Sequence, residues 1–158
     1  MSAEKIIRKL QLKPHPEGGF YRETYRSPQS LATIKSKRRN ISTAIYYLLE
    51  NEDKSHFHRI KSDELWFFHQ GNPLEILLIQ NDQIETIILG NDLENGEIPM
   101  AVIPAGTWFA SCIKNATGFS LVSCTVAPGF DFVDFQLAGK ENLLREYPHL
   151  KESIEKFT

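Results

Sequence analysis

Between residues 20 and 137, short runs of β-branched and aromatic residues alternate with clusters of turn-forming residues. This pattern predicts about ten strands. We expect them at Phe20–Arg26, Ser42–Leu49, His56–Ile60, Glu64–His69, Leu74–Ile79, Gln83–Leu89, Met100–Ile103, Thr107–Ile113, Phe119–Val126 and Asp131–Leu137. Because no helical period separates the runs, the pattern favours an antiparallel sandwich, jelly roll or barrel over a parallel α/β sheet.

Apolar positions recur with helical spacing at the two ends of the chain. They predict an amphipathic helix over residues 3–12 and one or two helices over Lys140–Tyr147 and Leu150–Phe157. The segment from Pro14 to Gly19 breaks the first helix, since it holds two prolines and a glycine pair, and we expect His15 there to be a turn or interface residue.

Composition narrows the class of protein. A chain of 158 residues fits one domain, taken as residues 1–158. The formal charge of −2 gives no positive field to attract nucleic acid or anionic lipid. Cys112 and Cys124 are expected to be buried free thiols. The sequence has no apolar stretch long enough for a signal peptide or a membrane span. We therefore expect a cytoplasmic protein with no nucleic-acid or membrane partner.

Residues 31–40 are predicted to form an exposed basic loop, which contains Lys35, Lys37, Arg38 and Arg39.

Three of the five histidines fall between residues 56 and 69, which is the part of the chain richest in reactive side chains. Side chains alternate along a strand, so His56 and His58 are predicted to point to the same face. Glu64 begins the next apolar run and can return to that face after a turn. His69 has the opposite parity to Glu64 and is expected to face away. Two histidines and a carboxylate form the facial triad of non-haem iron enzymes and also suit zinc.

These residues carry a resemblance to the cupin superfamily. The His-x-His pair, the later glutamate and Gly71 resemble the first cupin signature, and Pro104–Phe109 resembles the second. The opening His15–Arg26 and the later Ala127–Phe132 are similar to the "cupin five" domain family. The resemblance implies a mainly β fold, the cupin double-stranded β-helix or antiparallel jelly-roll barrel, with a core over residues 18–137 and a helical segment over 139–157. It also implies a homodimer and a ligand pocket inside the barrel, but no particular reaction.

Two departures from the cupin pattern bear on a cofactor. Five residues, rather than three or four, separate His58 from Glu64, so Asp63 could replace or assist Glu64. Phe109 stands where the resemblance places a third histidine ligand, and a phenyl ring cannot coordinate a metal. His56, His58 and Glu64 could still hold a divalent iron, zinc or manganese ion, and a protein without a cofactor is the alternative.

Without metal, a histidine paired with a carboxylate is a general base. The segment from Glu17 to Glu23 is also similar to the opening of the dTDP-sugar 3,5-epimerases, a cupin-like group that uses a histidine base and a tyrosine acid. The predicted catalytic residues are therefore His56, His58, Glu64 and Tyr47.

The predicted ligand-binding residues are Tyr21, Arg22, Trp66 and Phe109. Trp66 and Phe109 could contact the flat face of a nucleobase or a sugar ring in the pocket, or they could be core residues. We expect Trp108 to face away from Phe109. The functional hypotheses are proton transfer on a sugar- or nucleotide-like polar ligand, metal-dependent isomerase or oxygenase chemistry, and a non-catalytic binding or sensing module.

Overall fold

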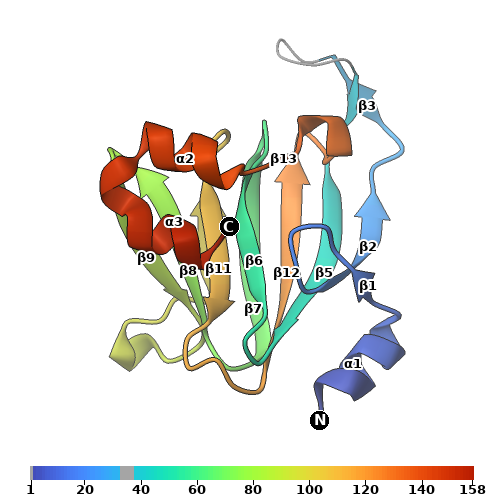
Figure 1. The fold of residues 1–158 in the computed structure, drawn as a ribbon. Helices are drawn as coiled ribbons and strands as arrows, with labels where there is room; N and C mark the ends of the chain where they lie inside the picture. Colours follow the sequence, from blue (N-terminus) through green and yellow to red (C-terminus); the bar gives the residue numbers. More distant parts are fainter. Residues whose placement is uncertain (1, 33–37) are drawn as a thin grey trace.

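The computed structural model describes residues 2–32 and 38–158, which form two antiparallel sheets (Figure 1). The first sheet has the order β1-β2-β5-β12-β7-β10, with bounds Lys13–Pro14, Phe20–Arg26, Thr43–Glu50, Phe119–Ala127, Asp63–Gly71 and Met100–Ile103. The second has the order β13-β6-β11-β8-β9, with bounds Gln136–Leu137, Lys54–Arg59, Phe109–Ile113, Leu74–Gln80 and Gln83–Leu89. A short pair, β3 (Ser30–Leu31) and β4 (Arg39–Asn40), stands apart from both.

Three α-helices lie at the ends of the chain. The helix α1 (Ala3–Leu10) opens it, and α2 (Lys140–Glu146) and α3 (Lys151–Lys156) close it. Short 3₁₀ turns form at η1 (Leu93–Asn95), η2 (Phe132–Asp134) and η3 (Pro148–Leu150). This confirms the predicted mainly β fold of cupin jelly-roll type with terminal helices. None of the helices in the described part of the chain is long and apolar enough to cross a bilayer.

The main core lies between the two sheets because alternate residues of each strand point inward. In β12, Val122 and Cys124 are buried on this inner face, where they pack with Tyr47, Trp66 and Phe109. Cys112 is buried on the outer face of the second sheet, and both thiols are free, as predicted.

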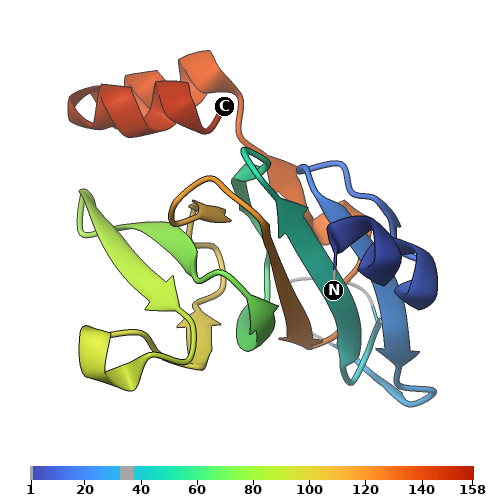
Figure 2. The same cartoon turned by 90° about the horizontal axis from the view of Figure 1, so that it is seen from below.

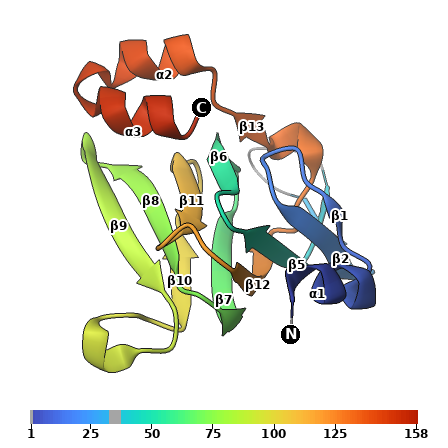
Figure 3. The same ribbon diagram turned by 60° about the horizontal axis from the view of Figure 1, so that its bottom comes forward.

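The two outer faces are covered by different helices. The C-terminal pair lies over the ends of β9, β8, β11 and β6 (Figure 3), and α1 lies beside β1 and β2 (Figure 2). Phe57 and Trp108 point outward under the C-terminal helices, where they pack with Leu143 and Phe157. Trp108 therefore faces away from Phe109, as predicted.

Residues 131–137 do not form the predicted continuous strand. The Asp131 side chain accepts a hydrogen bond from the Val133 backbone N–H at 3.0 Å and caps the turn η2, so that only Gln136–Leu137 remains extended. The cap explains the error, because a short acidic side chain can stabilise a turn in place of a strand.

The structure describes only part of the predicted basic loop, and one of its arginines is not exposed as predicted. Lys35 and Lys37 lie outside the described residues. Arg39 is 9% exposed, and its Nε lies 2.6 Å from an Asp134 carboxylate oxygen. This arginine is a buried ion-pair partner and not a solvated loop residue.

Candidate active site

A β-bulge in β6 decides which side chains enter the space between the sheets. Phe109 of β11 pairs with His58, but Ser111, two residues on, pairs with Ser55, three residues back. The extra residue in β6 changes the alternation, as bulges do. Ser55 and His58 consequently share the inner face, and His56 does not. The prediction that His56 and His58 face the same way is wrong for this reason.

The loop between β1 and β2 brings a second acid into the site. The Glu17 side chain is 6% exposed and lies against β6, where Ser55 Oγ donates a hydrogen bond to Glu17 Oε1 at 3.0 Å. The His56 backbone N–H and its ring Nδ1 both lie 2.8 Å from the Glu17 carbonyl oxygen. His56 therefore holds the Glu17 backbone in place instead of joining the cavity wall.

Gly18 and Tyr47 complete this anchor. Gly18 has a φ of +112°, and a Cβ atom there would collide with the Lys54 carbonyl oxygen, so only glycine permits this approach of the loop to β6. The Tyr47 hydroxyl donates a hydrogen bond of 2.7 Å to the Gly18 carbonyl oxygen. Tyr47 lines the cavity, but its proton is already engaged by the loop.

Glu17 and His58 form a buried pair that shares a proton. His58 Nδ1 lies 2.7 Å from the His56 carbonyl oxygen, which can only accept, so Nδ1 carries a hydrogen. His58 Nε2 lies 3.0 Å from Glu17 Oε2, and one proton must sit between these two atoms. Burial lowers the pKa of His58 to about 4 and raises the pKa of Glu17. The buried environment thus favours the neutral form, with the proton on Glu17.

Glu64 is a second carboxyl group in the same cavity. It is 7% exposed at the start of β7, beside the Cys124 thiol. Burial, and next the nearby Glu17, raise the pKa of Glu64 to about 8. Glu64 is therefore a carboxylic acid at neutral pH, able to give a proton to a ligand.

These groups lie in a cavity of about 550 Å³ that opens between the sheets, within the usual range for a small-molecule site. Of the predicted residues, His58, Glu64, Tyr47, Trp66 and Tyr21 line it with their inner-face side chains. Phe109 is fully buried behind the wall, with its ring centroid 4.1 Å from that of His58.

Arg22 lines the cavity at its edge. Its Nη1 lies 3.5 Å from Gln11 Oε1, and Arg22 shares the face of β2 that carries Phe20 toward α1. Arg22 nevertheless lines the cavity, and its Nε is buried without a hydrogen-bond partner among the described residues, so its ligand-binding role stays a prediction.

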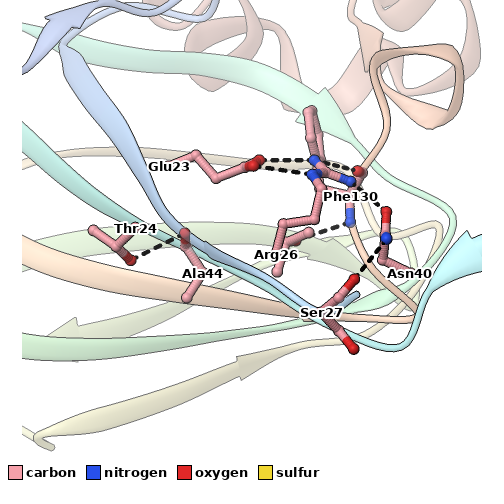
Figure 4. Close-up of polar contacts among 8 residues, drawn as sticks. Glu23, Thr24, Arg26, Ser27, Asn40, Ala44 and Phe130 are labelled. Atoms are coloured by element: carbon pink, nitrogen blue, oxygen red, sulfur yellow. Dashed lines mark hydrogen bonds and ion pairs between the residues drawn. The ribbon is translucent and has the colours of Figure 1, made fainter. Parts of the chain in front are cut away.

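The mouth of the cavity is fixed by a hydrogen-bonded cluster around Arg26 (Figure 4). The guanidinium makes two bonds to the Glu23 carboxylate, at 2.9 and 2.7 Å, and a third to Asn40 Oδ1 at 2.8 Å. A fourth, of 3.1 Å, reaches the Phe130 carbonyl oxygen. Arg26 thereby ties the segment after β12 to the edge of the first sheet.

Comparisons of the sequence and the structure with known proteins identify the family. The sequence profile of a family described as "Cupin superfamily (DUF985)" matches residues 4–138. The chain belongs to this cupin family. A hypothetical protein from Leishmania major has a similar structure, with a TM-score of 0.93 and 36% identity, covering 100% of this chain and 99% of that one.

Two further relatives resemble this cupin. A protein from Shewanella oneidensis of known structure has a TM-score of 0.92 and 42% identity, covering 100% of this chain and 98% of that one. An uncharacterized protein of Saccharomyces cerevisiae is 32% identical over 157 residues, covering 90% of this chain and 78% of that protein. None of these names assigns a reaction.

The side chains present do not fit the divalent metal that the wider cupin fold implies. The bulge removes His56 from the predicted set of His56, His58 and Glu64, and Phe109 fills the place of another ligand. Over residues 2–32 and 38–158, no group of three or more His, Cys, Asp or Glu side chains is arranged to hold a metal ion.

His15 and Glu17 are among the lining residues that were not predicted for the site. His15 was expected in a turn, yet its ring lies 4.4 Å from that of Tyr21, edge to face, and lines the cavity. The glycine pair after Glu17 was a usable signal, since two adjacent glycines often mark a close backbone approach. His69 lies on the outer face, 2.8 Å from Ser123 Oγ, as predicted.

Proposed function

We propose that this cupin binds a small organic molecule in the cavity and moves a proton on it, as in an epimerisation or isomerisation. The observation that carries the proposal is the buried contact of 3.0 Å between Glu17 Oε2 and His58 Nε2. Glu64, held as an acid in the same cavity, supplies the second half of an acid–base pair.

In the proposed reaction, the shared proton moves from Glu17 to His58 Nε2, and Glu17 Oε2 then takes a proton from a carbon atom next to a carbonyl group of the ligand. Glu64 gives its proton to the carbonyl oxygen, and an enol results. The reverse transfers restore the carbonyl with the proton on the other face or on the neighbouring carbon. The Trp66 indole N–H, which is buried without an acceptor in the described part of the chain, is a further donor for a ligand oxygen.

Deuterium exchange tests this proposal. The protein would be incubated in D₂O with a panel of sugars, nucleosides and ring compounds that carry a carbonyl group, and uptake of deuterium at carbon would be followed by mass spectrometry. We expect uptake with at least one compound, reduced roughly 10²- to 10⁴-fold by Glu17→Gln and by His58→Gln. The matched variant His69→Gln alters an exposed histidine on the outer face and should keep full activity.

The same panel separates catalysis from binding alone. A compound that raises the unfolding temperature but takes up no deuterium would identify the protein as a binding module and overturn the proton-transfer proposal.

A further inference from the structure

Aromatic rings line the mouth of the cavity above the Glu17–His58 pair. We call Phe130, Phe132 and Phe135 the aromatic rim. Their ring centroids lie 5.0 Å apart for Phe130 and Phe132, and 6.1 Å apart for Phe132 and Phe135. The Phe135 ring is also 5.5 Å from the His58 ring, so the aromatic rim continues directly to the base.

The 3₁₀ turn η2 explains why these rings gather on one side. Side chains three residues apart eclipse each other in a 3₁₀ helix, which places Phe132 and Phe135 on the same face, whereas a strand would send them to opposite faces. Phe132 remains 49% exposed although it is a large apolar side chain. A ligand in the mouth of the cavity would cover it.

The charged groups at the mouth are mostly satisfied by one another. Glu23 is paired with Arg26, Asp131 caps η2, and the Arg22 guanidinium reaches Gln11. Among the described residues, Lys13 is the lining cation without an ion pair or hydrogen bond, and its Nζ lies 5.2 Å from the centre of the Tyr21 ring. Arg22 and Arg26 both line the cavity, but a phosphate group that used them would have to displace the contacts of Arg26 with Glu23 and of Arg22 with Gln11.

Around the Glu17–His58 pair, the buried ionisable groups favour their neutral forms. Burial disfavours the charged form of His58 and of Glu64, and the apolar and aromatic part of the wall includes Tyr47, Trp66, Ile45 and Val126. Such a wall suits an apolar flat surface with one or two polar atoms better than a ring covered with hydroxyl groups.

We infer that the ligand is a compact planar ring compound without a phosphate group, whose ring lies against Phe132 and Phe135 above His58. This rests on the proposed function and deepens it, since it uses the same cavity and places a carbon atom attached to the ring, next to a carbonyl group, beside the proposed base. The sequence suggested a sugar-like or a nucleotide-like ligand. Of these two, the aromatic rim favours a planar ring, such as a nucleobase, over a sugar ring.

Fluorescence provides the test, because Trp66 lies in the cavity wall and Trp108 is on the other side of the second sheet. In a Trp108→Phe variant, Trp66 is the sole indole reporter. The probes would be benzamide, which is planar and neutral, cyclohexanecarboxamide, which has the same polar group on a puckered ring, and glucose. We expect saturable quenching by benzamide, with affinity at least about fivefold higher than for cyclohexanecarboxamide, and none by glucose.

A pair of neighbouring substitutions locates the contact. Phe132→Ala should weaken benzamide binding roughly fivefold to tenfold. Val133→Ala removes an adjacent side chain that is 71% exposed and does not line the cavity, and it should change nothing.

Three results would overturn the inference: no benzamide binding up to its solubility, equal binding of the two amides, or equal effects of the two substitutions. The binding test does not depend on catalysis, because quenching is read without any turnover. Ring binding without deuterium exchange would therefore refute only the proton-transfer proposal.

Discussion

Glu64 shows how burial of one carboxyl group makes the stability of the molecule depend on pH. The pKa of Glu64 is raised from 4.5 to about 8 in the folded protein, so between these values the folded state holds a proton that the unfolded state has released. Stability from this group is therefore complete below about pH 4.5 and is lost as the pH rises through about 8.

Glu64→Gln should remove this dependence while preserving shape. We expect the variant to be more stable than the parent protein at pH 9, by on the order of a few kcal/mol, and about equally stable at pH 5. Urea unfolding at pH 5, 7 and 9 would measure the difference. Glu85→Gln, at an exposed position on β9, is the control. A difference that does not change with pH would show that Glu64 ionises normally.

His58 acts in the opposite direction and at lower pH. Its pKa falls from 6.5 to about 4 on folding, so its contribution to stability is present above about pH 6.5 and is lost as the pH falls through 4. Between about pH 4.5 and 6.5 the rising contribution of His58 offsets the falling contribution of Glu64, so their combined contribution to stability is greatest in this range.

At the scale of elements, the bulge in β6 determines what the cavity can bind. A conventional strand would place His56 beside His58, and a histidine at position 109 would then complete a metal site. With the bulge, His56 instead contacts the Glu17 backbone, and a histidine at position 109 would add only one donor near His58.

Phe109→His should accordingly fail to create a high-affinity site for zinc or manganese. Equilibrium dialysis would compare metal binding by the variant and the parent protein, and circular dichroism would confirm folding, since Phe109 is fully buried. His56→Ala provides a second measurement and should leave any metal affinity of the parent protein unchanged. A tenfold gain in the first variant would contradict the prediction, and a loss in the second would show that His56 does reach the cavity.

The longer strands and the terminal helices could be predicted because each has a regular period in the sequence, whereas the two-residue strands β1, β3 and β4 were not predicted. The bounds of β2, β9 and β10 agree with their predicted ranges to the residue. The site could be predicted only where alternation holds, as for Glu64 and Trp66. The bulge, the loop that delivers Glu17 and the turn η2 are set by contacts between segments distant in sequence, and no local period reports them.

At the scale of the whole molecule, the C-terminal helices support the site from outside the barrel. Phe157 and Phe57 pack edge to face with ring centroids 5.9 Å apart, and the Phe57 backbone N–H donates a hydrogen bond of 2.9 Å to the Phe157 carbonyl oxygen. Phe57 lies within the bulge, directly before His58. The family profile ends at residue 138, but both solved relatives cover the whole chain, so these helices belong to the common structure.

Phe157→Ala tests this support. Phe157 is 1% exposed, and its removal should cost about 3–5 kcal/mol of stability, measured by urea unfolding. Because the lost contact holds the bulged segment, we also expect weaker ligand binding, although Phe157 lies on the opposite side of the second sheet from the cavity. Glu152→Ala, at an exposed position of α3, should alter neither property. If the folded Phe157→Ala variant bound ligand as tightly as the parent protein, the bulge would hold His58 without help from the helices.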